Sequence, residues 1–121
     1  MRKRSRYGIR GKTVDNIRFA SAREAARYVD LKLLLAAKVI RDLELQPAIP
    51  IIIGGVEIRF YSKRFHKNGR QMLYIADFRY FDREKNIVVT EDVKMESGHR
   101  TEVYTIKRAL MAAMGCQITE V

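Results

Sequence analysis

Two short stretches of the sequence place acidic side chains where strands are expected to end. The first, LYIADFRY, contains Asp77, and the second, IVVTEDVKM, contains Glu91, Asp92 and Lys94. Side chains alternate across a strand, so Asp92 and Lys94 share one face, with Cα atoms roughly 7 Å apart, while Glu91 points to the other face. If the two strands pair, Asp77 and Asp92 approach each other, and a cation is needed to relieve their repulsion.

Two carboxylates, a backbone carbonyl and a lysine at the end of a sheet suit chemistry on phosphate esters. Oxygen ligands of this kind bind Mg²⁺, which takes one or two carboxylates and keeps water and substrate phosphate in its other positions. Such a metal polarises a phosphoryl oxygen and acidifies a bound water, while Lys94 can orient that water or neutralise charge in the transition state. The sequence therefore favours a divalent metal at these carboxylates.

Other kinds of catalytic centre find little support. His66 and His99 stand apart and Cys116 is the only cysteine, so no zinc cluster is expected. The pair Gly54-Gly55 indicates only a turn, and the chain has no Walker-type glycine loop. No Ser/His/Asp or Cys/His arrangement has a spacing suited to nucleophilic catalysis.

Composition indicates a single basic domain with an affinity for polyanions. The 121 residues include 24 Lys and Arg against 14 Asp and Glu, a formal net charge of +10. Such a field attracts nucleic acid, although either basic cluster alone could be a solvated tail or loop. One predicted phosphate-binding cluster is Arg2, Lys3, Arg4, Arg6, Arg10 and Lys12, and the other includes Lys63, Arg64 and Lys67 beside Arg59, His66 and Arg70.

The same composition predicts a cytoplasmic location. A single cysteine cannot form an intramolecular disulfide, so folding does not depend on an oxidising compartment. The longest apolar run, near residues 49–53, is too short to cross a bilayer and is interrupted by Pro50. The basic residues at the N-terminus have no apolar segment behind them, so we expect no signal peptide and no membrane partner.

The first half of the chain is expected to supply an arm, a helix and extended segments. Residues 1–20 predict a basic arm with one short strand over residues 13–19. Ser21 and Glu24 form an S-x-x-E capping box, which predicts a helix over about residues 21–38. Residues 39–62 favour two extended segments with a turn at Gly54-Gly55.

The second half is expected to supply the strands that carry the acids. Asn68-Gly69 predicts a hairpin turn. Residues 72–82 and 86–95 predict neighbouring strands, followed by a helix over residues 101–114 that stops at Gly115, and by a short strand over residues 117–121. This order predicts an α/β or α+β fold, in which a mixed sheet is flanked by two helices.

The arrangement of the acids resembles the PD-(D/E)XK nuclease superfamily, in which an Asp at a strand end precedes an acid-x-Lys strand. Here Asp77 is followed by Asp92-Val93-Lys94. The resemblance implies a restriction-endonuclease-like core of the order α-β-β-β-α-β, as a single domain over residues 21–121. It also implies a further acid from the first helix, for which Glu24 is the candidate.

A second likeness covers the chain from about Phe19 to the C-terminus. The segments FASAREAARYVDLKLL, IRDLELQP, YIADFRYFD, VVTEDVK and TEVYTIKRAL resemble a family of small phage and prophage proteins of unknown function, DUF1064. Met95 is a departure, because Gly is expected there in that family.

Together these resemblances imply a Mg²⁺- or Mn²⁺-dependent endodeoxyribonuclease that hydrolyses phosphodiester bonds in phage recombination or replication. With no separate recognition domain, it would read DNA shape rather than sequence, and branched DNA such as a Holliday junction is the implied substrate of a homodimer. The implied catalytic residues are Glu24, Asp77, Asp92 and Lys94. The implied metal ligands are Asp77, Asp92 and the Val93 carbonyl, with Glu24 and Glu91 as further candidates. The expected DNA contacts are the two basic clusters, Tyr104 and Lys107.

Each of these residues also has a purely structural interpretation. Glu24 can act only as a helix cap, although it shares a helix face with Tyr28, Leu31 and Leu35. Asp77 can pair with Arg79, and Asp92 with Lys94, as ordinary salt bridges. Tyr104 and Lys107 lie one helical turn apart and can belong to an amphipathic face.

Two other kinds of protein remain as alternatives. The chain could be a non-catalytic nucleic-acid-binding module with a nuclease-like fold, or a basic structural protein of a phage or ribosomal assembly. A pure binder would lose affinity by turning Asp77 and Asp92 toward phosphate, which makes the binding module the weaker hypothesis.

Overall fold

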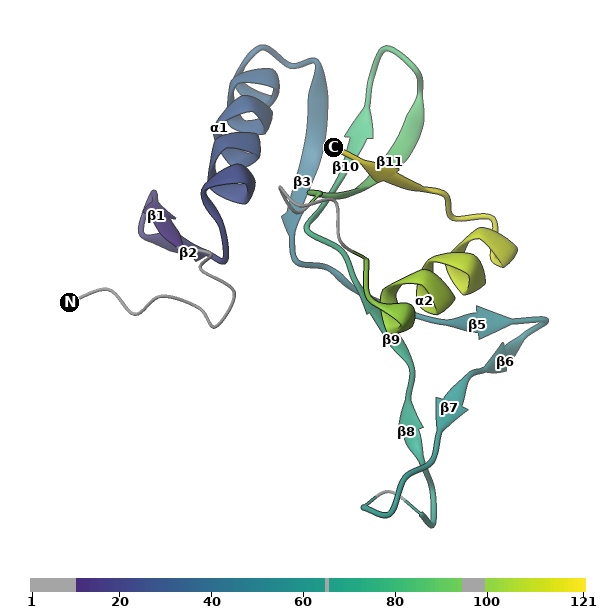
Figure 1. The fold of residues 1–121 in the computed structure, drawn as a ribbon. Helices are drawn as coiled ribbons and strands as arrows, with labels where there is room; N and C mark the ends of the chain where they lie inside the picture. The colour runs from purple at the N-terminus through teal and green to yellow at the C-terminus, as the bar shows by residue number, and fades with distance from the viewer. Residues whose placement is uncertain (1–10, 65, 95–99) are drawn as a thin grey trace.

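The computed structural model describes residues 11–64, 66–94 and 100–121, and within them the chain forms two helices and twelve short strands (Figure 1). The described part of the chain has an α+β fold with one four-stranded sheet and several two-stranded sheets. None of its helices is long and apolar enough to cross a membrane. Five basic residues of the first predicted cluster lie outside the described residues: Arg2, Lys3, Arg4, Arg6 and Arg10.

An N-terminal hairpin replaces the single strand predicted over residues 13–19. Strands β1 (Lys12–Val14) and β2 (Ile17–Phe19) pair antiparallel around Asp15 and Asn16, whose φ values are 51° and 62°. Asp and Asn tolerate this left-handed conformation, which a two-residue hairpin turn of this kind requires. Phe19 is buried in the core. The predicted arm of residues 1–20 is therefore too long, since residues 12–19 belong to the folded domain.

Helix α1 (Ala22–Ala36) begins as the capping box predicts. The Ser21 hydroxyl accepts a hydrogen bond from the backbone N–H of Glu24 at 3.1 Å. Ala25, Tyr28 and Leu31 are buried along one face, in agreement with the predicted stripe. The helix ends two residues before the predicted Lys38, whose φ of 62° cannot continue a right-handed helix.

The central sheet is mixed, as predicted. Its four strands lie in the order β12 (Ile118–Glu120), β11 (Ile87–Asp92), β10 (Phe78–Asp82), β3 (Ile40–Leu45). The pair β10 and β11 is antiparallel, as is β10 with β3, whereas β11 and β12 run parallel. Helix α2 (Glu102–Ala113) supplies the connection to β12, and its N-cap Thr101 accepts from the backbone of Tyr104.

Residues 39–62 do not form the two extended segments that the sequence predicts. They form β3, β4 (Ala48–Pro50), β5 (Ile52–Ile53), β6 (Val56–Glu57) and β7 (Arg59–Phe60). Positive φ angles at Asp42, Gln46, Gly54 and Gly55 interrupt regular strand geometry. The predicted turn at Gly54-Gly55 is confirmed, because it joins β5 to β6.

The predicted strand over residues 72–82 is also divided. Its residues form β9 (Leu73–Ile75) and β10, and the short strand β8 (Arg70–Gln71) comes just before them. The predicted hairpin at Asn68-Gly69 is confirmed by the pairing of β7 with β8, which extend away from the central sheet (Figure 1). Strand β9 pairs with β4 in a different sheet from β10, so the chain changes sheet at Ala76 and Asp77.

Two hydrophobic cores meet at this change of sheet. The first, the α1 core, contains Phe19, Ala25, Tyr28, Leu31, Ile40, Phe78 and Tyr80. The second, the α2 core, contains Ile51, Tyr74, Ala76, Met111 and Ile118. Tyr74 and Ala76 are therefore the buried residues of this segment, and Ile75 between them is 64% exposed.

Candidate active site

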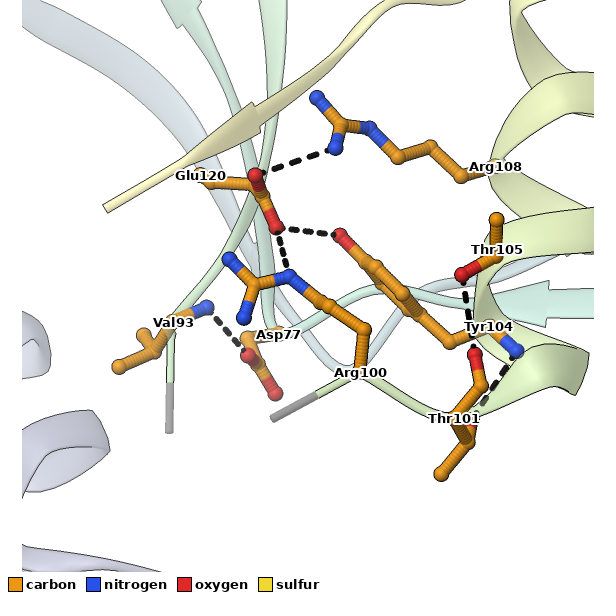
Figure 2. Close-up of polar contacts among 8 residues, drawn as sticks. All are labelled: Asp77, Val93, Arg100, Thr101, Tyr104, Thr105, Arg108 and Glu120. Atoms are coloured by element: carbon orange, nitrogen blue, oxygen red, sulfur yellow. Dashed lines mark hydrogen bonds and ion pairs between the residues drawn. The ribbon is translucent and has the colours of Figure 1, made fainter. Parts of the chain in front are cut away.

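The structure brings Asp77 and Asp92 together through the backbone. The N–H of Asp77 donates to the Glu91 carbonyl at 3.0 Å and lies 3.2 Å from Oδ1 of Asp92. In return, the N–H of Val93 donates to Oδ2 of Asp77 at 2.7 Å, the bond drawn in Figure 2. Each carboxylate is thus fixed in place by one of its two oxygens.

The second oxygen of each aspartate has no hydrogen-bond partner among the residues that the structure describes. Burial raises the pKa of Asp77, against the effect of its hydrogen bond from Val93, and the charge of Glu91 raises it further. Burial also raises the pKa of Asp92 to about 6, with a contribution from the charge of Glu120. Both carboxylates are therefore more costly to ionise in the fold than in water, which a bound cation would relieve.

Glu24 lies in the first turn of α1 and also near this pair. Burial raises the pKa of Glu24 to about 7, and the charges of Asp77 and Asp92 add to the effect, while a backbone hydrogen bond from Ala20 opposes it. Glu24 and Asp77 line one cavity together with Gln46. The position of Glu24 in the first turn of α1 therefore also places it beside the aspartates.

A larger cavity of about 210 Å³ opens on the other side of Asp77. It is lined by Asp77, Asp92, Val93, Lys94, Arg100, Thr101, Tyr104 and Glu120. Lys94 is exposed, and its backbone N–H donates to the Val121 carbonyl at 2.8 Å, which fixes the chain at this position. The cavity combines three carboxylates with cationic side chains, and carboxylates beside cations are what a phosphate ester bound through a metal requires.

Neither of the salt bridges considered as an alternative is formed in the described residues. Arg79 pairs with Glu44 at 2.7 Å rather than with Asp77. Lys94 forms no ion pair with Asp92. The salt-bridge interpretation of the two aspartates is therefore wrong.

Sequence reasoning missed three residues that surround Tyr104. Glu120 accepts from Nε of Arg100 at 2.6 Å, from the Tyr104 hydroxyl at 3.1 Å and from Arg108 at 3.1 Å (Figure 2). Asp92 and Glu120 are register partners in the parallel pair of β11 and β12. The sequence signal for Glu120 was an acid in the last predicted strand. That acid points to the site only once its strand is known to pair with the strand over residues 86–95.

Glu91 faces the other side of the sheet, as predicted, and is buried in the protein. It accepts from Nε and a terminal nitrogen of Arg27 at 2.8 and 2.6 Å, and from the hydroxyl of Tyr80. Its side chain is 1% exposed. Because both oxygens already hold internal partners, we leave Glu91 out of the proposed metal site.

The predicted DNA contacts are distributed differently. Tyr104 lines the cavity, whereas Lys107 donates from its ammonium to the Leu73 carbonyl at 2.9 Å and does not line it. Lys12 is exposed on β1. The residues of the second cluster are all exposed: Arg59 lies on β7, Arg70 lies on β8, and the loop between these strands carries Lys63, Arg64, His66 and Lys67.

The donor set fits a magnesium ion better than a metal that needs a complete protein cage. No group of three or more His, Cys, Asp and Glu able to hold a metal is found in residues 11–64, 66–94 and 100–121. Mg²⁺ is commonly bound by one or two carboxylates together with water and substrate phosphate. Two fixed aspartates, each with an oxygen to spare, match that requirement.

The chain belongs to the DUF1064 family, whose model is described as a protein of unknown function and matches residues 4–119. No curated protein and no solved structure matches the chain. The α+β fold and the paired aspartates are consequently the basis for a functional proposal.

Proposed function

We propose that this protein is a Mg²⁺-dependent endodeoxyribonuclease of the PD-(D/E)XK type, acting on branched DNA such as a Holliday junction. The observation that carries the proposal is the pair of aspartates. In each of them one carboxylate oxygen accepts a backbone hydrogen bond, and the pKa of each is raised above its ordinary value. Holding two such charges together does not stabilise a protein. A pair of this kind is expected where the carboxylates bind a catalytic metal ion.

The order of the elements supports the same class. Along the chain, α1, β3, β10, β11, α2 and β12 follow one another with the short outer strands inserted between β3 and β10. This is the α-β-β-β-α-β order that the resemblance to the PD-(D/E)XK superfamily implies. Asp77 precedes the second of these strands, and Asp92 ends the third.

Asp77, Asp92 and the carbonyl of Val93 would hold the ion. When bound, Mg²⁺ polarises the scissile phosphate and lowers the pKa of a coordinated water. Mn²⁺ can take the same oxygen ligands. Glu24, near both aspartates, would assist as an acceptor at the edge of the site.

Lys94 supplies the positive charge of the acid-x-Lys motif. It is exposed at the wall of the cavity, where its ammonium can donate to the attacking water or to a phosphoryl oxygen. Its backbone is fixed by the bond to Val121. The backbone position of Lys94 therefore depends on Val121 as well as on β11.

The charge of the chain supports DNA as the substrate. A formal net charge of +10 favours association with a polyphosphate backbone, and the exposed residues of the β7–β8 loop add local positive charge. Selectivity for branched DNA and action as a homodimer, with one site for each of two symmetric incisions, come from the resemblance to small phage nucleases.

The test is cleavage of labelled linear duplex, single strand, flap, fork and four-way junction, with and without Mg²⁺. We expect metal-dependent paired nicks on the four-way junction, lost in Lys94→Ala and in the double variant Asp77→Ala/Asp92→Ala. Lys85→Ala is the matched control, because Lys85 is exposed in the turn between β10 and β11 and lines neither cavity.

Binding separates the proposal from its main rival. The double aspartate variant should bind DNA as well as the wild type or better, because two negative charges near the phosphates are gone. Binding without cleavage under any divalent metal would instead identify a non-catalytic nucleic-acid-binding module. A double variant that still cuts would show that the site is assigned to the wrong residues.

A further inference from the structure

The hairpin of β7 and β8 has no part in the cores or in the cavities described above. No residue of these two strands, all of which the structure describes, belongs to the α1 core or the α2 core or lines either cavity. The hairpin extends away from the central sheet (Figure 1), and an isolated two-stranded hairpin is only marginally stable by itself. A role in packing the core therefore does not account for it.

Arg59 fastens the hairpin from within. Its Nε donates to the Asn68 carbonyl at 2.8 Å, one terminal nitrogen donates to the Gly69 carbonyl at 3.2 Å, and the other pairs with Glu57 at 2.5 Å. These bonds hold the turn at Asn68 and Gly69 against β7. Arg59 is thus a structural cation, and we assign it no ligand.

Tyr61 presents a ring that the hairpin supports and that is otherwise open to solvent. A Cβ added at Gly69 would lie 2.8 and 3.0 Å from two carbons of this ring, so the ring lies directly over the glycine. Tyr61 is nevertheless 63% exposed. A large ring held in this way offers contact area to a ligand at a low cost in conformational entropy.

Two lysines accompany this ring. Lys63 and Lys67 are exposed on the same loop and form no ion pair with any residue that the structure describes. No Asp or Glu occurs in residues 58–76, so this part of the chain supplies no acid to neutralise them. The charges of both lysines are therefore open to an anionic ligand.

An exposed ring beside two such cations suits unpaired nucleic acid. Proteins bind single strands through aromatic side chains on which bases stack, together with basic groups that contact the phosphates. In a duplex the neighbouring base pairs cover the base faces, and only the base edges are open in the grooves. Tyr61 can therefore stack on an unpaired base but not on a paired one, whereas Lys63 and Lys67 can contact phosphates of either form.

We propose that the β7–β8 hairpin binds single-stranded nucleic acid, with Tyr61 stacked on an unpaired base and Lys63 and Lys67 against neighbouring phosphates. The inference deepens the proposed function, because forks and flaps expose unpaired bases at the branch point, and it rests on that function only for the choice of DNA. The rival explanation is that Tyr61 merely covers Gly69 and that the lysines attract any nucleic acid by charge alone.

Binding to strands with and without bases separates these explanations. We would measure the affinity of the full chain for a short oligothymidylate, for an abasic strand of the same length and for a duplex, by fluorescence anisotropy in EDTA. Loss of one stacked base weakens binding by about 5- to 150-fold. We expect such a loss in Tyr61→Ala on oligothymidylate, and no loss on the abasic strand or the duplex.

Tyr61→Phe and Tyr61→Leu are matched variants. Tyr61→Phe keeps the aromatic face and should bind oligothymidylate as the wild type does. Tyr61→Leu keeps apolar bulk near Gly69 without an aromatic face and should bind it as weakly as Tyr61→Ala. Unchanged duplex binding shows that the hairpin of each variant is folded.

Two results would refute stacking by Tyr61. One is an affinity of Tyr61→Ala for oligothymidylate equal to that of the wild type, and the other is an equal loss on oligothymidylate and on the abasic strand. If Tyr61→Ala also loses duplex binding, the comparison of Tyr61→Phe with Tyr61→Leu decides. Equal affinities of these two variants for oligothymidylate would then refute stacking.

The salt dependence of binding tests the lysines. Each phosphate contact removed from a single strand lowers the slope of log K against log salt by about 0.7. We expect a decrease of about 1.4 in the double variant Lys63→Ala/Lys67→Ala, and no change in Tyr61→Ala, which alters no charge, or in the control Lys85→Ala. An unchanged slope in the double variant refutes the phosphate contacts.

These measurements need no cleavage, so they separate the hairpin from the proposed nuclease activity. If the wild type cuts no DNA in any divalent metal but Tyr61→Ala still loses affinity for oligothymidylate, the nuclease proposal fails and the hairpin proposal stands. If the wild type cuts and Tyr61→Ala keeps its affinity, the hairpin proposal alone is refuted. Tighter binding of oligouridylate than of oligothymidylate, with the same dependence on Tyr61, would overturn DNA as the source of the base.

Discussion

The raised pKa of Asp92 leads to an unusual expectation: removing its charge should stabilise the metal-free protein. Asp92→Asn keeps Oδ1 as an acceptor for the N–H of Asp77, so the backbone bond at 3.2 Å can persist. The change removes only the ionised oxygen that has no partner in the described residues. Most substitutions at partly buried positions destabilise a protein, so the sign of the effect is informative.

The magnitude follows from the pKa of this carboxyl. Burial raises it from 3.8 to about 6, which disfavours the ionised form by ~3 kcal/mol before screening. Asp92 is partly solvated, and solvent reduces such energies, so we expect a gain of about 1 to 2 kcal/mol in the free energy of unfolding at pH 8. At pH 4 the carboxyl is protonated in the folded state and partly protonated in the unfolded state, so most of the difference between variant and wild type should disappear.

The sign of the pH dependence can be stated directly. Between about pH 4 and pH 6, the folded protein holds a proton at Asp92 that the unfolded chain has already lost, so stability from this group falls as pH rises. Urea denaturation of wild type and variant in EDTA, at pH 8 and pH 4, measures the effect. Asp30→Asn, at an exposed position on α1, is the control and should be neutral. A loss of stability in Asp92→Asn at pH 8 would refute the electrostatic argument.

Three further changes test the metal, the core and the outer hairpin. Mg²⁺ at 100 times its dissociation constant should raise the free energy of unfolding, measured by calorimetry, by about 2.7 kcal/mol. An equal rise in the double variant Asp77→Asn/Asp92→Asn would show that the ion binds elsewhere. Leu31→Ala should cost about 2 to 5 kcal/mol in urea denaturation because Leu31 is fully buried, and a smaller loss would mean that the core closes around the gap. Gly69→Ala should cost about 1 to 2 kcal/mol because φ is +68°. The new Cβ would also lie 2.8 Å from a Tyr61 ring carbon, and hydrogen exchange in β7 and β8 should quicken, whereas unchanged exchange would contradict this reading.

The sequence was most informative where a local signal had a single physical cause. The Ser21 N-cap and the Asn68-Gly69 turn each act within a few residues, and the structure confirms both. The adjacency of Asp77 and Asp92 was also predictable, because two strands joined by a short polar loop pair as neighbours. The chemical roles of these residues remain predictions.

The sequence was least informative where distant segments decide the structure. Nothing near Glu120 indicates that its strand lies parallel to β11, and Arg100 precedes a helix in a segment with no periodic pattern. The breaks at Asp42 and Gln46 were missed for a related reason, because positive φ at a residue other than glycine is imposed by tertiary packing. The single strand predicted over residues 72–82 was wrong for the same reason, because β9 and β10 belong to different sheets.

The change of sheet at Asp77 links the catalytic proposal to cooperative unfolding. Ala76 is buried in the α2 core and Phe78 in the α1 core, so the single residue between them is the aspartate that faces the cavity. Proteins open locally in units that follow such packed clusters. A substrate bound at Asp77 would join the two units, so amide hydrogen exchange should slow in both cores when DNA binds, although DNA contacts neither interior.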